Sequence, residues 1–411
     1  MYRKVEFILI TILGSFIEFF DFTVYNFFSA QIAAAIFPHK SAYISMLLAF
    51  SIFALGFVIR PLGGIILGYI ADKKSRTLAL YWSMMLMAAA NLLLCCLPSF
   101  AMIGTAAPVL LVLARLCQGF ATGGESSVAS SLLIEAGYRP GLFLSFQFMA
   151  QGLSSFLGAA FAAGLNIWLS HQQLYDWGWR LPFLAGLCLT PLALMLRRYS
   201  YMQADKRPDT TEKTQLKQYW GQIFLSIMSI LPTSVAIYCM VFYMPHFLNQ
   251  IGFKNAGANF LITSYAGLFM AFGALLGGLF CDRVQRQKAL IVYLLGAIAG
   301  LAYISFTTLA AANSLCFISS YLLCVTHIGM LMTVSGLFIL QVFPTQIRAR
   351  SNAISYCIGV ALFGGTTNMA ITALQHYYHN NYMAFYYLLL ALTIGAVVFL
   401  VFPKAEPYGT K

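Results

Sequence analysis

Long apolar runs fill this sequence almost from end to end, and they restrict the folds that it can adopt. Several exceed 18 residues, including 78–97, 257–281 and 314–342, and a helix of about that length crosses a ~30 Å hydrocarbon core. The runs lack the polar–apolar alternation over about ten residues that barrel strands show. Because a helix satisfies its own backbone groups in lipid, we predict an all-α membrane protein.

The composition agrees with this prediction. Of 411 residues, 60% are hydrophobic and 9% are charged, whereas a soluble domain carries roughly 25% charged residues. The first run contains Glu18 and Asp21, is too long for the apolar region of a signal peptide, and is followed by no small-residue cleavage site. The nine cysteines lie in or beside apolar runs without metal-ligand spacing, so we interpret them as small core residues rather than as disulfides.

The apolar runs divide into twelve expected membrane spans. They cover 7–36, 43–71, 78–97, 106–134, 143–170, 181–198, 220–248, 257–281, 289–311, 314–342, 352–376 and 383–402. A polar stretch from Arg197 to Tyr219 separates the sixth from the seventh. We therefore predict an N-terminal six-helix bundle (1–198), a cytoplasmic linker (199–219) and a C-terminal six-helix bundle (220–411).

The distribution of basic residues predicts the orientation of the chain. The net charge is +12, and lysine and arginine gather in alternate loops, while the other loops hold only Lys40, Lys254 and Arg180. Such an excess marks the cytoplasmic side. We expect a multi-pass protein of the bacterial cytoplasmic (inner) membrane with both termini in the cytoplasm, and the basic charge requires no nucleic-acid partner.

One turn sequence, G-x-x-x-D-[KR]-x-x-R, occurs twice at an offset of half the chain. The first copy contains Asp72 and Arg76, and the second contains Asp282, Arg283 and Arg286. Repeated halves are typical of transporters whose site lies between two similar bundles. We expect these residues to form a cytoplasmic gate, with each aspartate pairing with a basic group or capping a neighbouring helix. The alternative is an ordinary polar turn.

Ionisable residues inside the spans are the main candidates for function, because a charge in the bilayer is costly unless it faces a polar interior. Glu18, Asp21 and Tyr25 share one face of the first span. The fourth span carries a polar stripe, the second carries an arginine, and the fifth carries two glutamines one turn apart. These further candidates are Arg115, Gln118, Thr122 and Glu125, then Arg60, then Gln147 and Gln151.

The buried acids suggest proton coupling. A carboxylate beside an arginine stays ionised, whereas one in an apolar pocket takes up a proton. Asp21 or Glu125, assisted by Glu18, would carry the proton by exchanging partnership with Arg115; the alternative is a static salt-bridge network that only packs the bundle. The second half offers hydroxyls and amides instead, such as Tyr243 and Tyr356, which we expect to bind substrate together with Tyr25, Arg60, Arg115, Gln118, Gln147 and Gln151.

Several segments resemble a known family. The sequence is similar to the metabolite:H+ symporter family of the major facilitator superfamily, which includes transporters for proline and betaine, citrate, 2-oxoglutarate and shikimate. The matching segments are Glu18-Phe-Phe-Asp21-Phe22-Thr-Val-Tyr25, Arg60-Pro-Leu-Gly-Gly64, Arg115-Leu-Cys-Gln118-Gly119-Phe-Ala-Thr-Gly123-Gly124-Glu125, Trp177-Gly-Trp-Arg180-Leu-Pro-Phe183 and Phe363-Gly-Gly365.

The resemblance implies twelve helices in two pseudosymmetric bundles, and it places Asp21, Arg115 and Glu125 on the substrate and proton pathway. A few positions depart from the family pattern, among them Ser75, Ser126, Cys357 and Asn368. These departures leave the substrate open, although they leave the fold unaffected.

We therefore expect a secondary active transporter that imports a small anionic or zwitterionic metabolite with protons by alternating access. The main alternative is a proton-antiport exporter of a drug or siderophore-like compound, but the fifth span lacks the Gly-Pro pair usual in such exporters. A membrane receptor or scaffold is a third class. No nucleophile–base pair, metal cluster or phosphate loop suggests an enzyme or a cofactor. The expected partners are a metabolite, H+ and membrane lipid, and we expect a monomer.

Overall fold

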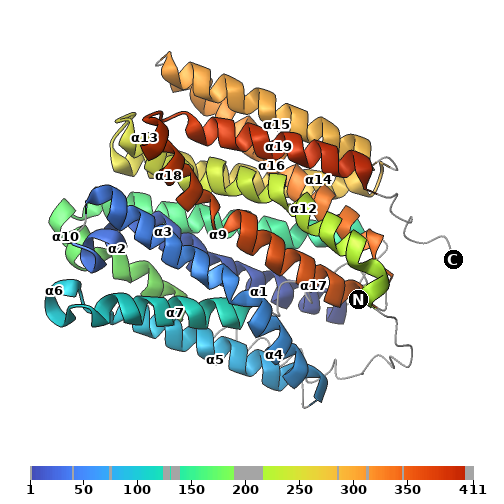
Figure 1. Cartoon of the computed structure of the whole chain (residues 1–411), viewed down its shortest axis with the longest axis horizontal. Coiled ribbons are helices and arrows are strands. Elements are labelled where there is room, and N and C mark those ends of the chain that lie inside the picture. The colour runs from blue at the N-terminus through green and yellow to red at the C-terminus, as the bar shows by residue number, and fades with distance from the viewer. Residues whose placement is uncertain are drawn as a thin grey trace.

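Helices make up the regular structure of the chain in the computed structural model, and no strand occurs in the residues described (Figure 1). Those residues are 2–38, 41–73, 76–123, 130, 139–188, 216–284, 287–311, 314–344 and 347–402. Eight helices within these ranges are long and apolar enough to cross a membrane. The all-α membrane class predicted from the apolar runs is therefore confirmed.

The first half of the chain forms helices in the order of the six expected spans. They are α1 (Tyr2–Phe27), α2 (Ser29–Ile36), α3 (Ala42–Val58), α4 (Arg60–Lys73), α5 (Arg76–Cys95), α7 (Ala106–Thr122), α9 (Pro140–Trp168) and a helix over 181–188. Shorter elements connect some of them: α6 (Phe100–Ile103), α10 (His171–Asp176) and the turn η1 (Gly178–Arg180). The later parts of the fourth and sixth expected spans lie outside the described residues.

The second half follows the remaining expected spans. Its elements are η2 (Leu216–Tyr219), α12 (Trp220–Ile237), η3 (Tyr238–Tyr243), α13 (Met244–Gln250), α14 (Ala256–Cys281), α15 (Gln287–Ala310), α16 (Ser314–Val342), α17 (Arg348–Gly359), η4 (Val360–Gly364), α18 (Thr367–Tyr378) and α19 (Met383–Val401). Most of the predicted linker, 199–219, and the boundaries drawn around it lie outside the described residues, so the division into domains stays a prediction.

Four spans are not regular α-helices throughout, which the hydrophobic pattern did not indicate. The first is interrupted at Phe28, between α1 and α2. The second span is interrupted at Ile59, between α3 and α4, just before Pro61. The seventh and eleventh contain the π-helical segments η3 and η4. Pro245 follows η3 and lacks the N–H that a regular helix needs, and π segments are frequent at functional sites. The irregular segments of the second, seventh and eleventh spans lie beside the central cavity described below.

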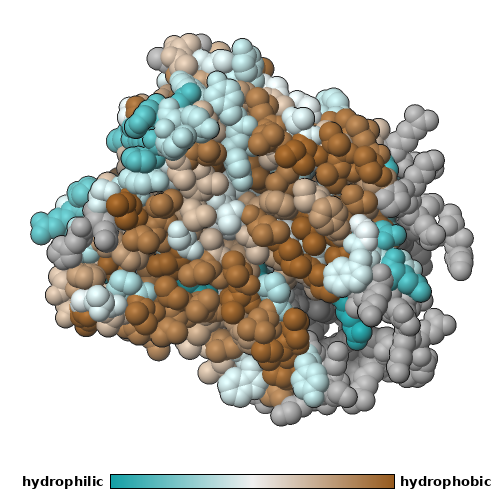
Figure 2. Space-filling model, viewed as in Figure 1, coloured by the Kyte–Doolittle hydropathy of each residue, from teal (hydrophilic) through white to brown (hydrophobic). Residues whose placement is uncertain are grey.

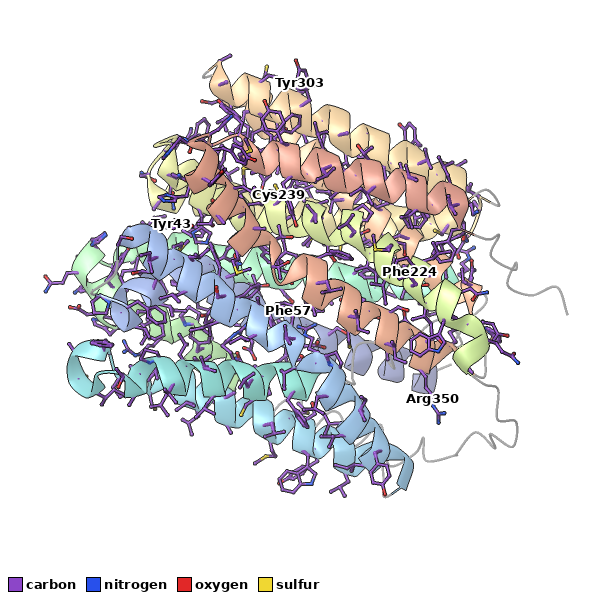
Figure 3. The ribbon with its side chains drawn as sticks, in the orientation of Figure 1. Tyr43, Phe57, Phe224, Cys239, Tyr303 and Arg350 are labelled. Atoms are coloured by element: carbon purple, nitrogen blue, oxygen red, sulfur yellow. The ribbon has the colours of Figure 1, made fainter. Side chains whose placement is uncertain are left out.

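The two halves lie side by side along the length of the bundle (Figure 1). The described chain begins with α1 and ends with α19 at one end of the bundle, which we call the terminus end (Figure 1). Arg350 is also there, whereas Tyr43 lies at the opposite end, the far end (Figure 3). Hydrophobic side chains cover the flank between the ends, and hydrophilic ones gather toward the ends (Figure 2). This distribution fits a bundle whose flank faces lipid.

Small residues bring α9 of the first half against α14 of the second. A methyl group added to Gly267 would lie 2.4 Å from the backbone nitrogen of Phe156, and one added to Gly152 would lie 2.6 Å from that of Ala271. Glycine is therefore needed where these backbones approach, as at other close helix contacts in membranes. The contact of α9 with α14 therefore holds the two halves together along these helices.

Candidate functional site

An open-sided cavity with about 980 Å³ of empty space lies between the two halves. Its lining includes Leu144 near the start of α9 and Leu340 near the end of α16, and both of those positions belong to the terminus end. The lining also reaches the middle of the bundle, where Figure 3 places Phe57. A cavity shared by both halves is the expected place for a transported substrate.

Aromatic side chains close the space between the halves toward the far end. The ring of Phe27 in α1 lies 5.8 Å from those of Phe242 and Phe260 in the second half. His246 in α13 hydrogen-bonds the carbonyl oxygen of Asn26 at 2.9 Å through its Nε2. These contacts separate the cavity from the far end, so the cavity faces the terminus end.

Arg60 is the charged side chain that lines the cavity among the residues described. It is only 2% exposed, and its guanidinium carbon lies 4.3 Å from the ring centroids of both Phe22 and Phe57. Such stacking stabilises a cation that has lost most of its water. The centroids of the two rings lie only 5.1 Å apart, so the rings lie next to each other rather than on opposite faces of the guanidinium.

Glycines at the contact between α4 and α7 determine the position of Arg60. A methyl group on Gly123 would lie 1.9 Å from the carbonyl oxygen of Arg60, and one on Gly63 would lie 2.0 Å from that of Phe120. Bulkier residues would push the two backbones apart. The same glycines that support the family resemblance therefore place Arg60 against the cavity.

Behind the cavity wall, a chain of hydrogen bonds joins Asp21 to Arg115 through two amides. Arg115 Nη1 donates to Gln118 Oε1, Gln118 Nε2 donates to Asn91 Oδ1, and Asn91 Nδ2 donates to Asp21 Oδ2, each at 2.7 Å. All four side chains are completely buried. The other carboxyl oxygen, Oδ1 of Asp21, accepts no hydrogen bond from any described residue.

This arrangement differs from the direct pairing of Asp21 with Arg115 that the sequence suggested. Arg115 acts electrostatically on Asp21, but the hydrogen bonds between them pass through Gln118 and Asn91. The guanidinium carbon of Arg115 lies 4.2 Å from the ring centroid of Tyr25 and 4.7 Å from that of Phe22. Aromatic rings thus occupy the space around the guanidinium. Glu125, the other proposed partner, lies outside the described residues.

Asn91 is the member of this chain that the sequence reasoning missed. It is the one amide or charged residue in the apolar run 78–97. A lone amide at that depth needs a polar partner, because lipid offers none. This isolation was a usable signal, although which partner it finds depends on how α1, α5 and α7 pack.

The polar lining of the first half comes mainly from α9. Gln147 and Gln151, one helical turn apart, both line the cavity. Ser130 Oγ donates to Gln147 Oε1 at 2.8 Å, which orients this amide. The sequence predicted both glutamines as binding residues, and the structure places both beside Arg60 in the cavity lining.

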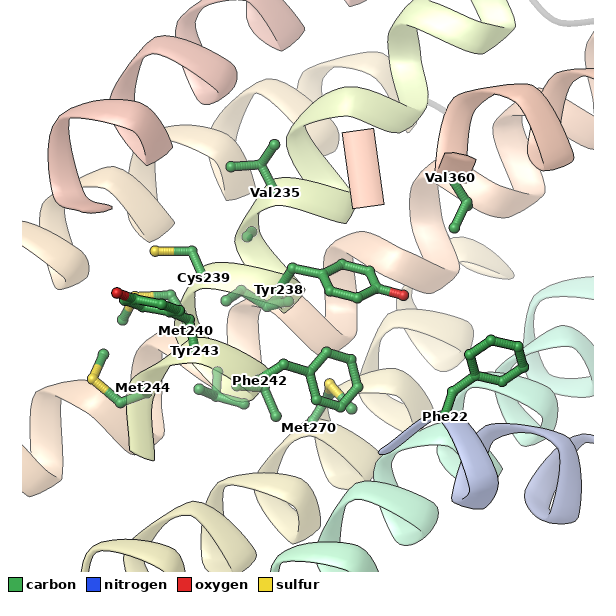
Figure 4. Close-up of a cluster of buried hydrophobic side chains, with 14 of the residues drawn as sticks. Phe22, Val235, Tyr238, Cys239, Met240, Phe242, Tyr243, Met244, Met270 and Val360 are labelled. Atoms are coloured by element: carbon green, nitrogen blue, oxygen red, sulfur yellow. The ribbon is translucent and has the colours of Figure 1, made fainter. Parts of the chain in front are cut away.

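The predicted binding residues of the second half separate into two groups. Tyr356 lines the cavity, and so does Tyr238. Tyr243 does not, because its hydroxyl donates to Gln375 Oε1 at 2.5 Å on the other side of η3. Figure 4 shows Tyr238 and Phe242 pointing toward Phe22 and Val360, whereas Tyr243 points away from them.

Tyr25, Arg115 and Gln118 also lie outside the cavity lining. Tyr25 donates its hydroxyl to the carbonyl oxygen of Ala49 at 3.1 Å, and Arg115 and Gln118 belong to the buried chain of hydrogen bonds. Of the eight residues predicted to bind substrate, those that contact the cavity are Arg60, Gln147, Gln151 and Tyr356. Glu18 is also buried and acts electrostatically on Tyr356.

At the terminus end, Asp282 of the second half caps a helix of the first. Its Oδ1 accepts from Gly141 N at 2.8 Å and its Oδ2 from Leu142 N at 3.1 Å. A carboxylate there satisfies free N–H groups and favours the positive end of the helix dipole of α9. Arg283 is exposed. The side chains of Asp72, Arg76 and Arg286 lie outside the described residues, so the matching contact of the first repeat is not visible.

Two helical halves around a shared cavity, with buried charges beside it, define a secondary transporter of the membrane. The chain belongs to the Major Facilitator Superfamily, whose family profile it matches over residues 11–364. The predicted fold is thereby confirmed, as is the suspected family resemblance.

Three curated proteins are similar to this chain over most of their length. The citrate-proton symporter of Klebsiella pneumoniae is 31% identical, with 93% of this chain and 88% of the relative covered. The alpha-ketoglutarate permease of Escherichia coli is 30% identical, with 96% and 92% covered. A putative proline/betaine transporter of Staphylococcus haemolyticus is 33% identical, with 95% and 85% covered.

Among solved structures, the xylose transporter of E. coli in a partially occluded inward-open conformation has the same fold. Its TM-score is 0.78 at 16% sequence identity, with 98% of this chain and 99% of that chain covered. A bacterial homologue of the iron transporter ferroportin, in an outward-facing state, gives a TM-score of 0.70 at 16% identity, with 98% and 99% covered. At such low identity the likeness concerns the fold alone.

Proposed function

We propose that this protein imports a small organic anion together with protons across the bacterial inner membrane. The observation that carries the proposal is the position of Arg60, a buried cation on the wall of the cavity between the two halves. A guanidinium at such a place recognises a carboxylate through its N–H edge. The proposed role of the cavity is binding, and no residue in its lining is assigned to catalysis.

Relatives support both the substrate class and the coupling ion. Two of them are a citrate-proton symporter and an alpha-ketoglutarate permease, which are both named for organic acids, and the first is also named for protons. A putative proline/betaine transporter extends the range to zwitterions. The arginine on the cavity wall favours an anion or a molecule with a carboxylate over a neutral or cationic compound.

Asp21 is the proposed proton carrier. One of its oxygens accepts no hydrogen bond from the described residues, and the other is linked through Asn91 and Gln118 to Arg115. A proton on Asp21 removes the negative charge that balances Arg115, so the two protonation states favour different arrangements of α1, α5 and α7. Glu18 and Glu125 are the other candidate carriers.

The repeated turns serve as the proposed gate at the terminus end. Asp282 links the halves by capping α9, and this contact would hold in one state and break in another. By the repeat, Asp72 would make the equivalent contact, assisted by Arg76, Arg283 and Arg286. The excess of basic residues in the terminus-end loops supports a cytoplasmic position for this end and for both termini.

The test is uptake into proteoliposomes that contain the purified protein. Labelled citrate, 2-oxoglutarate and monocarboxylates would be offered with and without an inward proton gradient, and empty liposomes would give the background. We expect the gradient to drive accumulation of at least one organic anion. Accumulation that ignores the gradient would contradict proton coupling, and gradient-driven expulsion of preloaded compounds would favour the exporter alternative.

A further inference from the structure

We infer that the substrate carries a single negative charge on an apolar body, as a monocarboxylate with a hydrocarbon or aromatic portion does. The inference rests on the proposed function and narrows its substrate class. It also separates this protein from relatives named for citrate and alpha-ketoglutarate, which carry more than one carboxylate.

The number of lysines and arginines inside the spans limits the negative charge that a bound substrate can carry. Of the 24 lysines and arginines in the sequence, only Arg60 and Arg115 stand within the spans rather than in loops or at span ends. Arg115 is fully buried, is bonded to Gln118, and does not line the cavity. Among the residues that the structure describes, a substrate in the cavity therefore meets one positive charge, that of Arg60.

The sequence of the segment around Ser130 adds no further lysine or arginine. The segment 124–138, which includes the described Ser130 of the lining, contains Glu125 and Glu135 but no lysine or arginine. Glu18 acts electrostatically on the cavity residue Tyr356, as Arg60 does. The local charge available to balance an anion is thus one at most, so a second carboxylate would lose its water without gaining a partner.

The geometry of Arg60 fits one carboxylate. Phe22 and Phe57 each lie 4.3 Å from the guanidinium carbon, with their ring centroids 5.1 Å apart, so the two neighbouring rings shield one part of the guanidinium from a ligand. Its Nε makes no hydrogen bond to any described residue. A planar guanidinium edge binds a carboxylate through two parallel hydrogen bonds. One bound carboxylate therefore neutralises the positive charge of Arg60.

The rest of the cavity favours an apolar body. Much of the wall consists of hydrocarbon and aromatic side chains, including Ile237, Phe242, Met270 and Met332. Neutral groups such as Gln147, Gln151 and Asn352 add hydrogen bonds without charge. This combination suits hydroxyl or carbonyl groups on a mainly hydrocarbon skeleton, because burial of apolar surface favours binding while each buried polar group needs a partner.

Matched ligands test the charge directly. The midpoint of thermal unfolding of the purified protein would be measured against adipate, its monomethyl ester and hexanoate, with citrate added for comparison, since a ligand of the folded state stabilises by mass action. The monomethyl ester keeps the carbon chain of adipate but carries one negative charge fewer. We expect the ester and hexanoate to bind roughly tenfold or more tightly than adipate and citrate, as an unpaired buried charge predicts.

Two variants separate specific binding from nonspecific effects of the ligands. R60Q should abolish stabilisation by the monoanions, because it removes the cation. T233K adds a second cation to the cavity wall, where Thr233 stands, and should shift the preference toward adipate by roughly tenfold. Because a misfolded protein would lose binding, a gain of adipate binding in T233K would show a real change in specificity.

Tighter binding of adipate or citrate than of the monoanions by the unaltered protein would overturn the inference, while proton-driven uptake of those polyanions would leave the proposed function intact. Failure of every organic anion to bind and to be transported would overturn both. Binding of the monoanions that survives in R60Q would also contradict the inference, because it would place the anion elsewhere.

Discussion

Arg60 and Arg115 are both buried arginines stacked on aromatic rings, yet they have different surroundings. Arg60 lines the cavity between the halves, whereas Arg115 is bonded to Gln118 and linked to Asp21 through Asn91. Phe22 contacts both guanidinium groups, at 4.3 and 4.7 Å. A ring shared by the substrate cation and the coupling cation provides direct contact between the two proposed functions.

The first prediction concerns the proposed proton carrier. Asp21→Asn keeps the size of the side chain but removes the titratable proton, so concentrative uptake driven by a proton gradient should fall to near background. Exchange of substrate across the membrane should persist in part, because it needs no net proton movement. Both activities would be measured in proteoliposomes.

Asp176→Asn provides the matched control, since Asp176 is exposed in α10 at the far end and should leave both activities unchanged. Full concentrative uptake by the Asp21→Asn protein would exclude Asp21 as the carrier and direct attention to Glu18 and Glu125.

The second prediction concerns the amide between the two charges. Asn91→Leu leaves Oδ2 of Asp21 and Nε2 of Gln118 buried without this partner, which should cost about 1–3 kcal/mol of stability. Because Asp21 loses the donor that favours its ionised form, the pH dependence of uptake should move to higher pH. Asn166→Leu, in which the lost bond is local to α9, should not move the pH profile. An unchanged profile in Asn91→Leu would assign Asn91 a structural role only.

At the scale of helices, close packing is concentrated where glycine allows it. The contact of α4 with α7 positions Arg60, and the contact of α9 with α14 joins the two halves. The interruption at Ile59 and the π segments η3 and η4 occur beside the cavity. The close contact of α4 with α7 adjoins the interruption at Ile59, because a methyl group on Gly119 would lie 2.6 Å from the side chain of Ile59.

The third prediction compares two glycines. Gly267→Ala places a methyl group 2.4 Å from the backbone nitrogen of Phe156, so it should destabilise the protein by about 1–3 kcal/mol as other overpacked positions do. Gly300→Ala meets no atom within 4 Å and should leave stability unchanged or slightly higher. Thermal unfolding in detergent measures both variants, and equal midpoints would show that the α9–α14 contact is looser than the structure indicates.

At the scale of the whole molecule, the two ends differ in their access to the cavity. The far end is closed, and the cavity faces the terminus end. Aromatic contacts and the His246–Asn26 hydrogen bond join the halves at the far end. If the terminus end lies in the cytoplasm, as the basic loops predict, this is an inward-facing arrangement. The orientation itself stays a prediction.

The fourth prediction tests that orientation. Green fluorescent protein fused to the C-terminus should fluoresce, because it would remain in the cytoplasm. Alkaline phosphatase, which needs the disulfides that form outside the cytoplasm, should be inactive there but active when fused after Lys254. The reverse pattern of the two reporters would invert the topology and contradict the predicted orientation.

The sequence alone determined the class of fold, the order of the spans and the buried charges, because the bilayer imposes its requirements on each span separately: apolar length, satisfied backbone and rare charges. The sequence also indicated Arg60, Gln147, Gln151 and Tyr356 as binding residues, because polar and charged side chains inside an apolar span are rare. Which residues contact one another depends on how spans far apart in the chain pack. Only the tertiary structure linked Asp21 to Arg115 through Asn91 and Gln118, turned Tyr243 away from the cavity, and left Arg60 as the charged side chain on its described wall.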